Sequence, residues 1–95
     1  MKSTLTPAEI EKALQNYPKW KLIDGKLSRE WTFRNFVEAI SFVNRVAPIA
    51  EAAGHHPDID IRYNRVILSL VSHDAGGITQ SDVAMAAQLS DEFQE

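Results

Sequence analysis

The sequence predicts an α+β protein in which one four-stranded antiparallel sheet carries its helices on one face, in the order α-β-β-α-β-β-α. Two observations support this class. Segments with apolar residues at every second position alternate with segments in which they recur every three or four residues. The strand-like segments come in neighbouring pairs joined by short turns, as in antiparallel hairpins. With 95 residues, the chain 1–95 is expected to form a single domain.

The first helix is expected to run from Thr6 to about Asn16. The residues Thr6, Pro7 and Glu9 form a helix start, in which threonine caps, proline suits the first helical position and glutamate completes a capping box. Pro18 disfavours helical geometry in the residue before it, so the helix is expected to end near Asn16.

Two strands are predicted on either side of Asp24-Gly25, a pair that tolerates the positive φ angles of a tight hairpin turn. The returning strand alternates, and one of its faces carries Leu27, Arg29, Trp31 and Phe33. Arg29 is the polar exception on that face. We expect its aliphatic stem to lie along Trp31, because arginine can bury its methylene groups and still keep its charge solvated.

A long amphipathic helix is predicted for residues 35–53, where apolar residues recur at intervals of three and four. Asn35 is placed to cap its start, and Gly54 is placed to end it. Pro48 lies inside this segment and lacks the N–H of a helical hydrogen bond. We therefore expect a kink or a break near residues 44–47.

A second hairpin and a last helix complete the predicted fold. Ile59, Ile61 and Tyr63 alternate with charged residues and predict a third strand, and Asn64 is expected to make the turn. The fourth strand, 66–71, is apolar on both faces and is therefore expected in the centre of the sheet. A threonine–aspartate capping signature after a glycine-containing loop then opens the last helix.

Composition and charge exclude several classes of protein. The net charge of −3 provides no basic surface for DNA or RNA phosphates. The chain has no cysteine, which excludes disulfides, thiolate metal sites and a thiol nucleophile. Its first residues lack the apolar segment of a signal peptide, and no apolar run is long enough to span a membrane. We expect a cytoplasmic protein that binds neither nucleic acid nor membrane.

All three histidines, His55, His56 and His73, fall in the second half of the chain. Imidazole exchanges protons near neutral pH and also binds metals, so this grouping predicts proton transfer or a metal site. Three imidazoles with Glu51 or Asp82 would be a suitable ligand set for zinc or iron. Adjacent residues of an extended segment point in opposite directions, however, which disfavours one ion shared by His55 and His56.

A family resemblance is carried by an extended signature, Glu51-x-x-x-His55-His56-Pro57 followed by Tyr63, His73 and Asp82. This signature resembles the active site of the pterin-4a-carbinolamine dehydratases. The likeness extends upstream to Trp20, Leu27-x-Arg29-x-Trp31-x-Phe33, Phe36 and residues 46–51, and so covers nearly the whole chain. Two positions depart from the pattern: Trp31 stands where members commonly carry Phe or Tyr, and Ile61 stands where some members have Asn.

The resemblance implies a hydro-lyase that removes water from 4a-hydroxytetrahydropterin, a by-product of aromatic amino-acid hydroxylation, and yields quinonoid dihydropterin. It implies His55 and His73 as the proton-transfer residues and His56 as the residue that mainly orients the pterin. Three further residues are expected to support the site, Glu51, Pro57 and Asp82. Either carboxylate could accept an imidazole N–H, and the proline shapes the turn. No cofactor or metal is implied, since the pterin is the substrate, and the family likeness implies homodimers or homotetramers.

Two other functions stay open at this point. One is the metalloprotein built on the three histidines and a carboxylate. The other is a non-catalytic dimeric interaction module, because animal members of the resembled family also act as dimerisation cofactors of a homeodomain transcription factor. Two signature residues also suit purely structural roles: Asp82 fits the first turn of any helix, and Tyr63 fits the core side of a strand.

Overall fold

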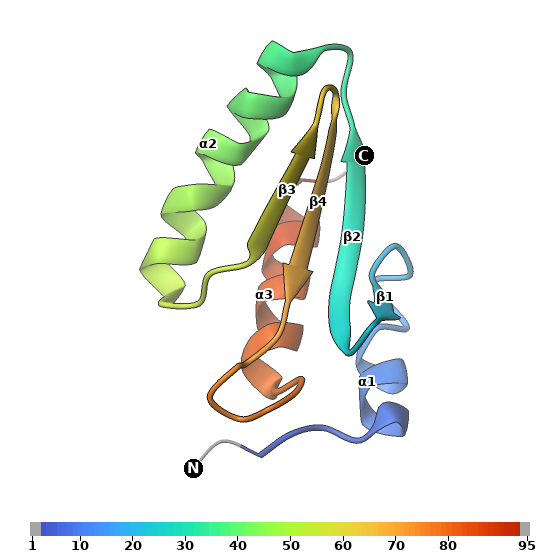
Figure 1. Cartoon of the computed structure of the whole chain (residues 1–95). Coiled ribbons are helices and arrows are strands. Elements are labelled where there is room, and N and C mark those ends of the chain that lie inside the picture. The colour runs from blue at the N-terminus through green and yellow to red at the C-terminus, as the bar shows by residue number, and fades with distance from the viewer. Residues whose placement is uncertain (1–2, 94–95) are drawn as a thin grey trace.

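The computed structural model describes residues 3–93, and the predicted domain bounds at residues 1 and 95 lie outside that range. Its elements follow the predicted order (Figure 1). They are α1 (Pro7–Ala13), β1 (Lys21–Ile23), β2 (Lys26–Thr32), α2 (Phe36–Ala53), β3 (Asp58–Arg62), β4 (Arg65–Leu70) and α3 (Gln80–Glu92). The strands form one antiparallel sheet in the order β1-β2-β4-β3, which confirms the α+β class and the central place of the fourth strand.

The helices share one face of the sheet, and the core lies between the two layers. Alternate residues of β2 and β4 point into it, and all three helices contribute apolar side chains to the same cluster. The buried set includes Ile10, Trp20, Leu27, Trp31, Phe42, Val46, Leu68, Leu70, Val83 and Leu89. Burial of such a cluster is the main favourable term in the folding of the domain.

Arg29 lies on the core face of β2, where the alternation of the strand placed it, and its side chain is buried. Its guanidinium carbon lies 4.1 Å from the centre of the Trp31 ring, so the charge stacks on the aromatic face in a cation–π contact. The predicted contact with Trp31 is therefore present, but the charged group is drawn inward with the stem.

The helix caps follow the sequence closely. Thr6 and Glu9 form the predicted capping box, Asn35 accepts a hydrogen bond from the backbone of Glu38, and Gly54 ends α2 with a φ of 65°. The first helix is shorter than expected, since it ends at Ala13 and continues only as turns to residue 16.

Pro48 does not break α2, which runs without interruption from Phe36 to Ala53. Proline removes one helical hydrogen bond, and this loss is local. Val46 and Ala50 lie on either side of it and are both buried against the core, so packing holds the two halves of the helix together. The prediction of a break is therefore wrong.

Tyr63 is not on the core side of a strand. The pairing of Arg62 with Arg65 leaves only two residues for the turn, so Tyr63 joins Asn64 there, with a φ of 55° and a 66% exposed side chain. Asn64 anchors this turn by donating from its side-chain amide to the carbonyl of Phe33 at 2.9 Å. Among residues 3–93, no helix combines the length and the apolar character that a membrane crossing requires.

Candidate active site

The candidate site lies where the end of α2, the end of β4 and the start of α3 meet. The backbone N–H of His55 bonds the carbonyl of Ala50, which wraps the chain tightly around the left-handed Gly54. Pro57, half-buried, then directs the chain into β3 at Asp58. The two adjacent histidines therefore sit on a short turn that the helix cap and the proline fix from both sides.

His55 contacts Asp82, which comes from the first turn of α3, 27 positions along the chain. His55 Nε2 and Asp82 Oδ1 lie 2.6 Å apart. The aspartate side chain is fully buried, whereas that of His55 keeps 15% of its surface exposed. A short contact between an imidazole and a buried carboxylate holds the ring in one orientation.

Two further residues hold Asp82, and sequence reasoning did not assign either of them to the site. Ser72 donates from its hydroxyl to Asp82 Oδ2 at 2.8 Å, and the backbone N–H of Thr79 donates to the same oxygen at 2.8 Å. The hydroxyls of Ser72 and Thr79 are themselves 2.8 Å apart. Thr79 was recognisable as a helix cap, but no sequence pattern links Ser72 to a carboxylate ten positions away.

His56 has a different partner. Its Nε2 lies 2.8 Å from Glu51 Oε1, one helical turn back on α2, and both side chains are exposed, at 63% and 81%. Glu51 thus contacts an imidazole as expected, and that imidazole belongs to His56, five positions on. The neighbouring histidines face two different carboxylates, in line with the opposite directions expected of adjacent residues.

His73 lies one residue beyond Ser72, in the turn that the Ser72–Gly77 bridge closes, and its side chain is exposed. Within the described range its imidazole has no hydrogen-bond partner. Gly76 has a φ of 77° in this turn, and a Cβ on Gly77 would lie 3.2 Å from the Thr4 side chain. The glycines therefore allow a tight turn beneath His73 and a close approach of the N-terminal segment.

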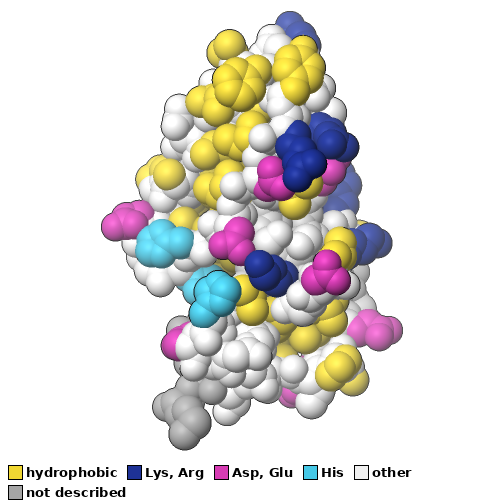
Figure 2. Space-filling model, in the orientation of Figure 1, with side chains coloured by type: hydrophobic (Ala, Val, Ile, Leu, Met, Phe, Trp, Pro, Cys, Tyr) yellow, Lys and Arg dark blue, Asp and Glu magenta, His cyan; other side chains and the backbone are white. Residues whose placement is uncertain are grey.

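Figure 2 shows histidine side chains exposed on one face of the molecule, with acidic side chains near them. Residues 3–93 contain no group of three or more His, Asp or Glu side chains placed to hold one metal ion together. The structure separates the donor set considered above into two histidine–carboxylate pairs and one exposed histidine.

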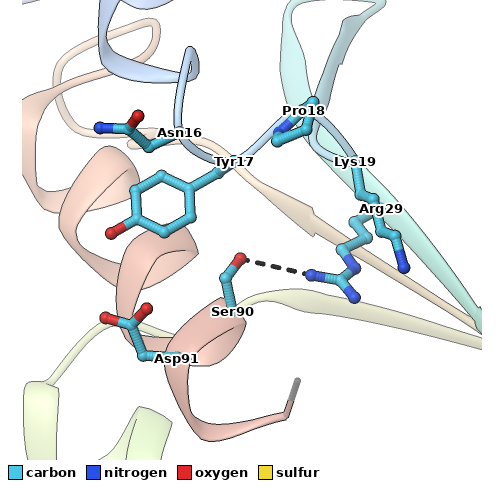
Figure 3. A pocket seen from close by; sticks show the side chains of 7 residues that line it. All are labelled: Asn16, Tyr17, Pro18, Lys19, Arg29, Ser90 and Asp91. Carbon is cyan, nitrogen blue, oxygen red and sulfur yellow. Dashed lines mark hydrogen bonds between the residues drawn. The ribbon is translucent and has the colours of Figure 1, made fainter. Parts of the chain in front are cut away.

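Hollows of the surface also lie away from the histidines. One, of about 330 Å³, is lined by Asn16, Tyr17, Pro18, Lys19, Arg29, Ser90 and Asp91 (Figure 3). At its centre, Ser90 Oγ accepts hydrogen bonds from Trp20 Nε1 at 2.9 Å and from Arg29 Nη1 at 3.3 Å. These bonds connect α3 to β2 and to the residue before β1, so Ser90 has a packing role at this hollow. The histidines instead sit at an open surface.

Fold and site together define a small α+β protein with histidines on a turn and a buried carboxylate behind one of them. The chain belongs to the pterin 4 alpha carbinolamine dehydratase family, whose model matches residues 3–92. This result confirms the resemblance drawn from the histidine signature.

Several relatives are similar over most of their length. A protein of Acidobacterium capsulatum, provisionally named a pterin-4-alpha-carbinolamine dehydratase, is 56% identical over 85 residues, which cover 90% of this chain and 92% of that protein. A Picosynechococcus protein with the same provisional name is 50% identical over 86 residues, covering 90% and 94%.

Two solved structures share the fold. One, described as a transcriptional coactivator/pterin dehydratase from Brucella melitensis, has a TM-score of 0.85 and 33% identity, and the match covers 94% of this chain and 97% of that one. The other, a pterin dehydratase-like protein identified as a RuBisCO assembly factor in the alpha-carboxysome, has a TM-score of 0.64 and covers 81% and 92%. At 20% identity, this second match shows the fold alone.

Proposed function

We propose that this protein is a hydro-lyase that converts 4a-hydroxytetrahydropterin to quinonoid dihydropterin and water in the recycling of tetrahydropterin. The observation that carries the proposal is the contact between His55 and the fully buried Asp82. It provides an oriented imidazole at an open surface, where a flat substrate can reach it. Membership of the dehydratase family supplies the substrate class.

The reaction needs two proton transfers. The bond between the bridgehead carbon and its hydroxyl breaks, the departing oxygen takes a proton and leaves as water, and the neighbouring ring nitrogen gives up its proton as the carbon–nitrogen double bond forms. Imidazoles can give and accept protons near neutral pH. We assign these transfers to His55 and His73, and we assign orientation of the pterin mainly to His56. No metal or other cofactor takes part in this scheme.

The test is rapid mixing of the purified protein with 4a-hydroxytetrahydropterin, followed by absorbance as dihydropterin forms. We expect dehydration well above the spontaneous rate, and we expect the same rate after treatment with a chelator. A rate equal to the spontaneous one would contradict the proposal. Activity that chelation removes and an added ion restores would instead favour the metalloprotein.

A second candidate function is a dimeric interaction module without catalysis. It is favoured by the Brucella melitensis relative, whose description joins a transcriptional coactivator to a pterin dehydratase. The two functions predict different results in the mixing experiment, because an interaction module gives no acceleration and its histidines can be replaced without effect on partner binding.

We also propose that the protein acts in the cytoplasm as a homodimer or homotetramer. β1 and β3 are the edges of the sheet, and an open edge carries backbone groups that another chain can pair with. Sedimentation at micromolar concentration checks the oligomer, and a species of monomer mass alone would contradict it.

A further inference from the structure

We propose that Ser72 and Thr79 are positioning residues that fix His55 in one tautomer, with its proton on Nε2, and leave Nδ1 as the nitrogen that exchanges a proton with the ligand. The importance of this tautomer for catalysis rests on the proposed dehydratase function. The tautomer itself follows from the hydrogen bonds around Asp82 and can be measured without substrate.

The first step of the argument concerns Asp82 Oδ2, which faces only donors. The backbone N–H of Thr79 lies 2.8 Å away and can only donate. The Ser72 hydroxyl donates to the same oxygen at 2.8 Å, and the Thr79 hydroxyl lies at 3.4 Å. The Ser72 hydroxyl and the Thr79 N–H both give their protons to Oδ2, so this oxygen acts as an acceptor.

The second step concerns the direction of the two hydroxyl protons. Ser72 and Thr79 are each 2% exposed, so their hydroxyls depend on protein partners. Each has a single proton, and Ser72 uses its own on Asp82. The 2.8 Å contact between the hydroxyls is therefore satisfied when Thr79 donates to Ser72. This arrangement forms a short relay from Thr79 through Ser72 to Asp82, in which each bond polarises the next.

The third step concerns His55. Because Asp82 is a carboxylate held as an acceptor, the atom facing Oδ1 at 2.6 Å must be a donor, which places a hydrogen on His55 Nε2. A neutral imidazole has one N–H, so Nδ1 then carries the lone pair. Nδ1 is the only ring nitrogen left for a ligand, because Asp82 occupies the other one. His56 has no such constraint, since its carboxylate partner is exposed and residues 3–93 place no comparable set of donors behind it.

The experiment is ¹⁵N–¹H correlation spectroscopy of the imidazoles at a pH where they are neutral. The chain has only three histidines, so His56→Gln and His73→Gln variants assign the His55 signals. We expect a protonated Nε2 and an unprotonated Nδ1 in the wild type. A protonated Nδ1 on His55 would overturn the proposal whatever the enzyme activity, and an inactive protein with a protonated Nε2 would contradict only the proposed function.

Substitution of Ser72 tests the relay. In Ser72→Ala we expect His55 to populate both tautomers, and we expect turnover to fall roughly 10- to 100-fold with little change in the Michaelis constant, as for a misoriented catalytic group. Ser72→Thr keeps the hydroxyl and should restore both properties. Ser69→Ala is the matched control, because Ser69 lies in β4, three residues before Ser72, and bonds Ser28 at 3.0 Å, away from Asp82.

Thermal unfolding establishes that each variant is folded before its spectrum is compared. A folded Ser72→Ala variant with an unchanged His55 tautomer and normal turnover would overturn the role of Ser72. If Ser72→Ala does not fold, the spectra of the wild type and of Ser72→Thr still test the proposal. Both proteins retain the hydroxyl, so both must show a protonated Nε2 on His55.

Discussion

The two histidine–carboxylate pairs of the site have similar geometry and very different surroundings. His55 and Asp82 are 2.6 Å apart, and His56 and Glu51 are 2.8 Å apart. The first pair joins segments 27 positions apart and ends on a buried carboxylate that accepts hydrogen bonds from the Ser72 hydroxyl and the Thr79 backbone N–H. The second pair spans five positions on one helix end and is exposed on both sides.

This difference shows that distance alone does not determine what an ion pair or hydrogen bond contributes. In an exposed pair, water solvates both charges whether or not they are in contact. The net contribution of the pair to stability is therefore small, and salt weakens it further. A buried pair cannot exchange its partners with water, so its geometry is kept and its loss is expensive. We therefore expect His55 to provide chemistry that depends on orientation, and His56 to provide binding.

The largest expected effect comes from removal of the proposed proton-transfer residues. His55→Ala and His73→Ala should each lower turnover, roughly 10²- to 10⁴-fold for the loss of a full general acid–base contribution. The double variant should lose nearly all catalysis and still fold and bind a non-reacting dihydropterin. Stopped-flow assays with circular dichroism and dihydropterin titration check this expectation.

The bridgehead carbon of the substrate is a stereocentre, so the same experiment can also measure the rate for each epimer of the hydroxyl. Imidazoles on different sides of the ring could each serve one epimer of the hydroxyl, in which case a single variant would show two kinetic phases with racemic substrate. A double variant with near-normal rates on both epimers would contradict the assignment of His55 and His73.

The second effect is on stability and separates the two carboxylates. Asp82→Ala leaves the donors of Ser72 and Thr79 buried without an acceptor, so we expect a loss of about 2–4 kcal/mol in the free energy of unfolding. Glu51→Ala removes an exposed partner and should cost less than about 1 kcal/mol. Urea denaturation of both variants measures the difference, and equal losses would show that the burial of Asp82 has no energetic consequence.

The third effect concerns His56. If its exposed imidazole mainly holds the pterin, His56→Ala should raise the Michaelis constant more than it lowers turnover, because lost uniform binding has that signature. Steady-state kinetics beside His55→Ala provide the comparison. A His56→Ala variant with unchanged Michaelis constant and strongly reduced turnover would move His56 into the proton-transfer step.

The part of this molecule that sequence reasoning could reach is the local part. The caps at Thr6, Asn35 and Gly54 depend on neighbours within a few residues, and each has the conformation or contact expected of it. Pro48 was misjudged because its local cost is outweighed by the burial of Val46 and Ala50, which no local rule contains. Tertiary packing overrode propensity at that point.

Within the site, the limit is again distance along the chain. The signature named both carboxylates, but which imidazole each one contacts depends on how the turn after Gly54 directs two adjacent side chains. Ser72 was out of reach because its contact with Asp82 requires the loop of residues 73–78 to close, and a serine at the end of a strand has no distinguishing pattern. Residue type therefore supplied the candidate residues, and the fold determined which of them contact one another.

The smallest expected effect is the salt dependence of the exposed pair, Glu51 and His56. The attraction between Glu51 and a protonated His56 acts across solvent, where the Debye length falls from about 30 Å at 0.01 M to about 8 Å at 0.15 M ionic strength. Glu51→Gln should therefore change the Michaelis constant by a few-fold at most at low salt and by less at physiological salt, with turnover nearly unchanged. The Asp82 pair is buried and less screened, so the ratio of turnover between the wild type and Asp82→Asn should stay constant over the same salt series. Kinetics of the three proteins at several ionic strengths provide the measurement. Two results would contradict the order of screening that burial predicts. One is a turnover ratio between wild type and Asp82→Asn that changes strongly with salt. The other is an effect of Glu51→Gln on the Michaelis constant that is present at low salt and does not decrease as salt is added.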